Sequence, residues 1–356
     1  MGNNRLDRDS IPSLAEVFKD DFLFGFGGMQ SWDVPNRLLS GDPTLTALIR
    51  KHARIVTVNS LYPPQLAGKG FQPEWNWKMC DDLVAWAQKN GMKIRFHPLT
   101  WLFHREQGLE CLLKKPDGSL VDRDTAIGKI SDYVHTVLGR YKGVGYAVDV
   151  LNEATPRHKG DPEKNGLKPG LWQEVVGPEI VEIVFKAARE ADPGIKLFYN
   201  EDEMWQADKR PYDLALIQNL KSKGLIDGIG MQQHITMERP TLKELDEEFA
   251  DFARLGLDIH ITELDLNMNP HHNVTRWTDE LAQDQARRYR DVFEVYKKYG
   301  LKSSLPGKLT AVMPWEILDP QTWLSRYHPG VPNWPLFFDG KMDPKPAFWA
   351  IVGGKG

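Results

Sequence analysis

Two glutamates stand out because each lies at the end of a strand-like run of apolar residues. Glu153 closes the run 145–153, directly after Asn152, and Glu263 lies near the end of the run 258–265. Two carboxyl groups can cleave a glycosidic bond when one protonates the leaving oxygen and the other, ionised, acts from the opposite side of the sugar. A single glutamate at a strand end is more often a salt-bridge partner or a helix cap, so the neighbouring residues decide.

Polar and aromatic side chains that could bind a sugar stand at the ends of other strand-like runs. In chain order they are His97 and Trp101, Asn200-Glu201, Gln232-Gln233-His234, Asp265, and Trp315-Glu316. Amides and imidazoles can hydrogen-bond ring hydroxyls, and an indole can stack on the apolar face of a sugar. Because so many strand ends share this chemistry, the pattern favours a glycoside hydrolase. Within it, we expect Glu201 and Glu316 to have structural or supporting roles.

These strand ends belong to one rhythm that runs along the whole chain. Short apolar runs alternate with amphipathic helical patterns. The runs are 22–28, 54–60, 93–99, 145–153, 196–201, 227–234, 258–265 and 309–316. They are nearly continuous in apolar character, which is typical of parallel strands covered on both faces.

The intervening helices carry recognisable start and stop residues. The pattern over 75–90 ends at Asn90-Gly91, where glycine allows a left-handed stop. Thr241 and Glu244 form a capping box, with Leu242, Leu245, Phe249 and Phe252 following at helical spacing. The pattern over 278–299 places Ala282, Ala286, Tyr289, Phe293 and Tyr296 on one stripe.

Eight strands alternating with helices, without a linker, predict an α/β fold: one (β/α)8 TIM barrel forming a single domain. The catalytic groups of such barrels lie at the C-terminal ends of the strands. An open doubly wound sheet has the same alternation but more often carries a glycine-rich phosphate turn after its first strand. Here Gly25, Gly27 and Gly28 are followed by Met29, Gln30 and Ser31, which breaks the dinucleotide fingerprint.

Composition restricts the partners. The formal net charge is -4 and the sequence pI is about 6.2, so no basic field favours nucleic acid. No apolar run is long enough to predict a membrane span or a signal peptide. We expect a cytoplasmic protein, or a secreted one whose signal was removed. The two cysteines, Cys80 and Cys111, are expected to be free.

No metal or cofactor is expected. His271 and His272 are adjacent, but no third ligand follows at a useful spacing. The sequence also contains no Cys-x-x-Cys, His-Glu-x-x-His or Gly-x-Ser-x-Gly motif.

From about residue 13 to 352, the chain resembles glycoside hydrolase family 10, the endo-β-1,4-xylanase family. The resemblance rests on long motifs in the family's order: SLAEVFKDDFLFGFG, RYKGVGYAVDVLNEA, ADPGIKLFYNEDE, IDGIGMQQHI, HITELDL, AVMPWEILDPQTWL and WPLFFDGKMDPKPAFWA. It implies a catalytic domain over 13–352 after an N-terminal tail at 1–12. It also implies a β-linked polysaccharide or oligosaccharide as the substrate.

The resemblance implies a role for each site residue. Glu153 would be the acid/base and Glu263 the nucleophile of a retaining endo-β-1,4-xylanase that cleaves by double displacement. His234 would contact Glu263 and be oriented by Asp265. The residues implied to bind or enclose the sugar are Asn59, His97, Trp101, Asn152, Gln232, Trp315 and Trp323.

Departures from the family pattern leave the substrate open. Tyr62 stands where the family has a lysine, Leu102 where it has a second histidine, and Val148 where a tryptophan is common. The family's Asn-Asp-Tyr-Asn becomes the segment 200–203, Asn-Glu-Asp-Glu. Tyr62 and Leu102 predict a more apolar sugar pocket. The alternatives are therefore a hydrolase of the same mechanism acting on another β-glycan or a short glycoside, or a barrel that binds glycans without cleaving them.

Overall fold

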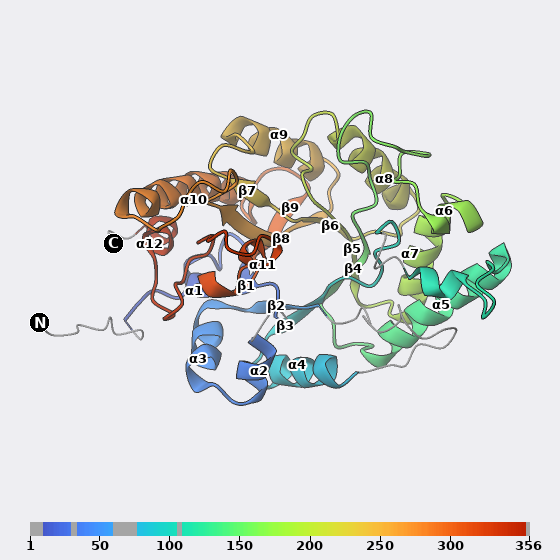
Figure 1. Cartoon of the computed structure of the whole chain (residues 1–356), viewed down its shortest axis with the longest axis horizontal. Helices are drawn as coiled ribbons and strands as arrows, with labels where there is room; N and C mark the ends of the chain where they lie inside the picture. The colour runs from blue at the N-terminus through green and yellow to red at the C-terminus, as the bar shows by residue number, and fades with distance from the viewer. Residues whose placement is uncertain (1–9, 30–33, 60–76, 105–108, 354–356) are drawn as a thin grey trace, which may run out of the picture.

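Parallel strands form a closed barrel at the centre of the molecule (Figure 1). The computed structural model describes residues 10–29, 34–59, 77–104 and 109–353. In these residues the barrel strands are β1 (Leu23–Phe26), β2 (Ile55–Val58), β3 (Lys93–Phe96), β4 (Ala147–Asn152), β5 (Lys196–Glu201), β6 (Gly228–Met231), β8 (Asp258–Asn267) and β9 (Lys308–Pro314). Strand β1 pairs with β9 and β6 with β8, which closes the ring. The predicted single-domain (β/α)8 barrel is confirmed, and each predicted run contains a strand.

One predicted run is divided in two. The run 227–234 was expected to be a single strand, but β6 ends at Met231 and a short strand β7 (His234–Thr236) follows. Between them Gln233 has φ 60°, a left-handed conformation that cannot continue an extended strand. Strand β7 pairs with the far end of β8, so that His234 lies opposite Asp265.

Helices surround the barrel on all sides in Figure 1. They are α1 (Leu14–Val17), α2 (Val34–Leu39), α3 (Pro43–His52), α4 (Lys78–Lys89), α5 (Arg123–Arg140), α6 (Leu171–Val175), α7 (Ile180–Ala191), α8 (Arg210–Ser222), α9 (Leu242–Ala253), α10 (Asp279–Tyr299), α11 (Trp323–Tyr327) and α12 (Pro346–Val352), with 3-10 turns η2 (Glu110–Leu113) and η3 (Asp319–Gln321). None of these helices is long and apolar enough to cross a membrane in the described part of the chain.

The predicted helix ends are confirmed where they can be followed. Helix α4 ends at Asn90, and Gly91 follows with φ 69°. The Thr241 hydroxyl accepts from the Glu244 amide at 3.2 Å, and the Glu244 carboxylate accepts from the Thr241 amide at 2.8 Å. The predicted stripe of α10 is buried along its whole length. The predicted start of α4 at residues 75 and 76 lies outside the described residues.

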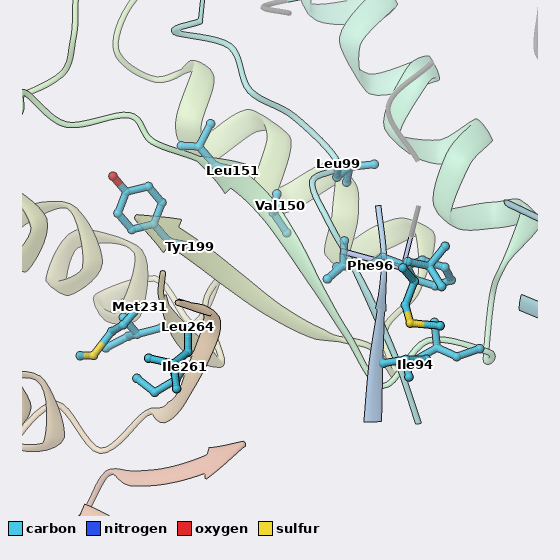
Figure 2. Packing of buried hydrophobic residues seen from close by; sticks show 14 of the residues in the cluster. Ile94, Phe96, Leu99, Val150, Leu151, Tyr199, Met231, Ile261 and Leu264 are labelled. Carbon is cyan, nitrogen blue, oxygen red and sulfur yellow. The ribbon is translucent and has the colours of Figure 1, made fainter. Parts of the chain in front are cut away.

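Apolar strand residues pack in two separate places. One large cluster joins the outer face of the barrel to the helices, and Figure 2 shows part of it, with Phe96, Val150 and Tyr199 among the labelled side chains. A small second cluster of Ile55, Ala311 and Met313 lies inside the barrel, since the next residues on these strands belong to the outer cluster. The two faces of each strand are therefore both covered.

The cysteines lie away from the barrel axis. Cys80 is buried in α4 and Cys111 is partly buried in η2, and both are free, as predicted.

Candidate active site

The two predicted catalytic glutamates are joined by a chain of amide hydrogen bonds on the C-terminal rim of the barrel. Asn200 Nδ2, at the end of β5, donates to Asn152 Oδ1 and to Glu263 Oε1, both at 2.8 Å. Asn152 Nδ2 and Gln232 Nε2 donate to Glu153 Oε1 at 3.3 and 2.9 Å. The strand ends thus bring both carboxyl groups into one polar network.

His234 and Asp265 form the predicted relay beside Glu263. His234 Nε2 lies 3.3 Å from Glu263 Oε2, and its Nδ1 lies 2.9 Å from Asp265 Oδ2. Burial lowers the pKa of His234, but the carboxylates of Asp265 and Glu263 outweigh it and hold the pKa well above its usual value. The raised pKa favours the protonated imidazole, which can donate from both nitrogens.

A second histidine approaches Glu263 from β3. His97 Nε2 lies 3.7 Å from Glu263 Oε1, and its Nδ1 lies 2.8 Å from Asp149 Oδ2. Burial alone would raise the pKa of Glu263, but His97, His234 and the Asn200 amide lower it below its usual value. Glu263 is thus kept ionised, as a carboxylate nucleophile must be.

Glu153 has a different setting. It directly follows β4, its side chain is partly exposed, and its φ is 51°. A non-glycine residue in this left-handed region costs about 1–3 kcal/mol, which surrounding contacts must offset. Such strain gathers at functional sites and here belongs to the partly exposed glutamate of the pair.

The two tryptophans predicted to enclose the sugar lie beside the two histidines. Trp315 follows β9, and its ring lies 5.5 Å from the His97 ring. Trp323 begins α11, and its ring lies 5.1 Å from the His234 ring. Its indole Nε1 donates to Asp265 Oδ2 at 2.6 Å, so Asp265 orients an aromatic side chain as well as a histidine.

The two glutamates predicted to be structural have structural contacts. Glu316 is buried and accepts from the Trp323 amide at 2.8 Å and from Arg326 Nη2 at 2.6 Å, which fixes the start of α11. Glu201 is also buried and accepts from the Thr155 amide at 3.2 Å. These contacts agree with the supporting roles expected of Glu201 and Glu316, which stay predictions.

The remaining predicted residues differ in how firmly the structure connects them to the glutamates. Asn59 directly follows β2 on the same rim. Trp101 lies beyond β3, with its ring 4.2 Å from the His104 ring. Leu102 is 1% exposed and part of the core, so the prediction that it makes the sugar pocket more apolar is wrong. Tyr62 lies outside the described residues.

Other residues of the site were not assigned from the sequence. Asn200 was noted at a strand end, but its bridging role was not predicted. Asp149 could have been found as a lone acid within an apolar strand.

Beyond β5, Arg157 Nη2 lies 3.5 Å from Asp202 Oδ2. Burial raises the pKa of Asp202 to about 7, although His234 and Arg157 favour its charged form.

No metal-binding group emerges from these side chains. Within the described residues, no three His, Cys, Asp or Glu side chains are placed to hold a metal ion. The His272 ring packs against the His328 ring, 4.5 Å between centroids.

A (β/α)8 barrel with two glutamates on its rim, connected through the side-chain amides of Asn200 and Asn152, has the architecture of a glycoside hydrolase. Residues 13–353 match the sequence model of glycosyl hydrolase family 10. An endo-1,4-beta-xylanase of Geobacillus stearothermophilus is 33% identical, with 96% of this chain and 98% of that protein covered. The chain belongs to glycosyl hydrolase family 10.

Further relatives agree in sequence and in structure. Endo-1,4-beta-xylanase A of Thermotoga neapolitana is 34% identical over 97% of this chain, which spans only 31% of that relative's length. The solved structure of a xylanase from Paenibacillus barcinonensis, in complex with a conduramine derivative, superposes with a TM-score of 0.84 at 28% identity, covering 97% of this chain and 99% of that one. An intracellular xylanase of Thermoanaerobacterium saccharolyticum in complex with xylotetraose gives a TM-score of 0.81 at 30% identity, with 97% and 99% coverage.

Proposed function

We propose that this protein is a retaining endo-β-1,4-xylanase that hydrolyses xylan or xylo-oligosaccharides. The observation that carries the proposal is that hydrogen bonds from side-chain amides connect Glu153 with Glu263. Glu153 is partly exposed, whereas Glu263 is buried and its pKa is lowered. Membership of glycosyl hydrolase family 10 and the xylanase relatives support this substrate class. The xylotetraose complex of the Thermoanaerobacterium relative supports a chain of β-linked xylose as the ligand.

Each glutamate has a separate task in the proposed reaction. Glu263 attacks the anomeric carbon while Glu153 gives its proton to the glycosidic oxygen, so the bond breaks and a glycosyl-enzyme forms. In the second step Glu153 takes a proton from water, and the resulting hydroxide displaces Glu263 from the sugar. Two inversions at one carbon give net retention.

The surrounding residues assist these steps. His234, His97 and Asn200 stabilise the negative charge of Glu263 before attack. They stabilise it again when hydrolysis of the glycosyl-enzyme restores the carboxylate. Asn152 and Gln232 can exchange their contacts with Glu153 for sugar hydroxyls. The proposed sugar-binding set is completed by Asn59, His97, Trp101, Trp315 and Trp323.

The test is a comparison of polysaccharides. We expect the protein to release reducing ends from xylan, with little release from mixed-linkage glucan or cellulose, and Glu263→Ala to abolish the release. Proton NMR should show the β-anomer as the first product, as retention requires. Release from a glucan but not from xylan would contradict the substrate, and an initial α-anomer would contradict the nucleophile role of Glu263.

A further inference from the structure

The backbone of Glu153 is held on both sides by hydrogen bonds from distant parts of the chain. Its amide donates to the Asn200 carbonyl at 3.0 Å. Its carbonyl accepts from Lys168 Nζ at 2.9 Å, and the Lys168 amide also donates to the Ala154 carbonyl at 2.8 Å. Lys168 therefore grips two successive peptide groups of the left-handed segment.

The next two amides are held from β5. The Ala154 amide donates to Tyr199 Oη at 3.2 Å, and the Thr155 amide donates to Glu201 Oε2 at 3.2 Å. The Tyr199 hydroxyl in turn donates to Glu201 Oε2. The amides of residues 153, 154 and 155 thus all have partners on β5, two of them side-chain oxygens of a buried tyrosine and a buried glutamate.

A buried charged cluster supports these contacts from below. Lys209 Nζ lies 2.6 Å from Thr155 Oγ1 and 3.5 Å from Glu201 Oε2. The Thr155 hydroxyl donates to Asp213 Oδ1 at 2.6 Å. Lys209, Glu201 and Asp213 are at most 1% exposed, so the cluster is part of the rigid interior. Burial of these charged groups costs free energy, and their contacts with Thr155 fix the segment that follows Glu153.

Glu263 has no comparable arrangement. It lies within strand β8 and is not among the residues with a positive φ, although the pairing of β8 with β9 shifts register between Ile261 and Leu264. Its amide donates to the Gln232 carbonyl at 3.0 Å. The extended conformation of β8 is the ordinary one for that residue, whereas the left-handed conformation of Glu153 depends on added contacts. Loss of a hydrogen bond to the backbone of residues 153–155 should therefore displace Glu153 and leave Glu263 in place.

We propose that Lys168, Tyr199 and Glu201 are positioning residues that hold the Glu153 carboxyl in line with the leaving glycosidic oxygen. The proposal rests on the acid/base role proposed for Glu153. The direction of the Cα–Cβ bond follows from the backbone angles, so a segment that relaxes from φ 51° turns the carboxyl away from its target. Proton transfer requires a heavy-atom approach of about 2.6–3.2 Å, which leaves little tolerance for such a turn.

Lys168→Met is the main variant, because Lys168 is partly exposed and the substitution removes the ammonium donor while keeping the backbone contact. The measurement is kcat/KM on xylotetraose and on a 2,4-dinitrophenyl xylobioside, whose leaving group departs without protonation. We expect the loss on xylotetraose to exceed the loss on the dinitrophenyl substrate by about tenfold, the cost of one lost charged hydrogen bond. The change should be in kcat rather than KM, and Lys168→Arg should restore most of the activity.

Matched variants separate positioning from general damage. Lys164→Met removes an exposed lysine of the same loop and should leave both substrates unchanged. Tyr199→Phe removes the hydroxyl that accepts from Ala154 and should show the same leaving-group dependence as Lys168→Met. An unchanged melting temperature of Lys168→Met establishes that the variant is folded.

Glu153→Gln, measured in parallel, distinguishes the two proposals. If Glu153→Gln loses activity mainly on xylotetraose while Lys168→Met loses nothing, or loses both substrates equally, the positioning role is overturned and the acid/base role stands. If Glu153→Gln itself loses activity equally on both substrates, the acid/base role is overturned, and the positioning role that rests on it is overturned too.

Discussion

At the scale of single residues, the charge state of Glu263 depends on its neighbours. The side chain is 7% exposed, and burial on its own disfavours the carboxylate. His97, His234 and the Asn200 side-chain amide reverse this and lower its pKa. The proposed nucleophile is therefore favoured in its ionised form before any substrate binds.

Removal of His234 should make the enzyme more sensitive to acid. In His234→Asn the pKa of Glu263 rises, so a larger fraction is protonated and inactive at low pH. The acidic limb of the kcat/KM profile should move to higher pH, and the loss of a charged hydrogen bond should lower the maximum about ten- to hundredfold. His271→Asn, which changes an exposed histidine, should leave the profile unchanged. An acidic limb that stays in place in His234→Asn would show that Glu263 does not set it.

Residues at strand ends could be predicted from the sequence, whereas the bonds between them could not. Glu153 and Glu263 followed from their positions in apolar runs and from the resemblance, whereas the His234–Asp265 relay followed from the resemblance alone. The bridge made by Asn200 depends on the barrel geometry, which places residue 200 next to residue 263. Lys168 lies in an irregular segment, where no periodicity relates its side chain to the Glu153 carbonyl.

At the scale of elements, local patterns predicted helix ends well and missed the break in one strand. The capping box of Thr241 and Glu244 needs only residues three apart, so the sequence contains all of it. The break at Gln233 depends on tertiary contacts of its side chain. Gln233 Nε2 donates to Glu248 Oε2 on α9 at 2.8 Å, and Gln233 Oε1 accepts from the Tyr296 hydroxyl on α10 at 3.3 Å. No local pattern encodes these partners, so the run was interpreted as one strand.

The cap of α9 should make a measurable contribution to stability. Thr241→Ala removes the hydroxyl that accepts from the Glu244 amide, which typically costs about 1 kcal/mol. For a protein of this size we expect the melting temperature to fall by roughly 1–3 °C. Thr275→Ala, at an exposed loop position, is the control and should leave the melting temperature unchanged. Equal behaviour of the two variants would mean that the cap adds nothing to the folded state.

At the scale of the whole molecule, the barrel interior and the site form one continuous structure. Arg95 and Asp149 are fully buried and paired inside the barrel. Asp149 also binds His97, which faces Glu263 on the rim. The alternation that predicted the barrel identifies strands and helices, but it does not reveal that a charge network runs from the core to Glu263. Disturbing the interior should therefore affect catalysis as well as folding.

The stability that Glu248 contributes to the barrel should decrease as the pH rises from about 5 to 8. Glu248 is fully buried between α9 and its neighbours, and burial raises its pKa to about 8 despite the hydrogen bond from Gln233. An unfolded glutamate has a pKa near 4.3, so the folded state holds one more proton across this window, and its stability is lost as the pH approaches 8.

Glu248→Gln tests this pH dependence, because glutamine has nearly the same shape and is neutral at every pH. Relative to the original protein, the variant should gain little stability at pH 5 and an increasing amount toward pH 8, on the order of a few kcal/mol. Melting temperatures of both proteins across this range measure the difference. Glu247→Gln, at a half-exposed position of the same helix, should follow the original protein at every pH. A constant difference between Glu248→Gln and the original protein would mean that Glu248 is already ionised in the folded state at pH 5.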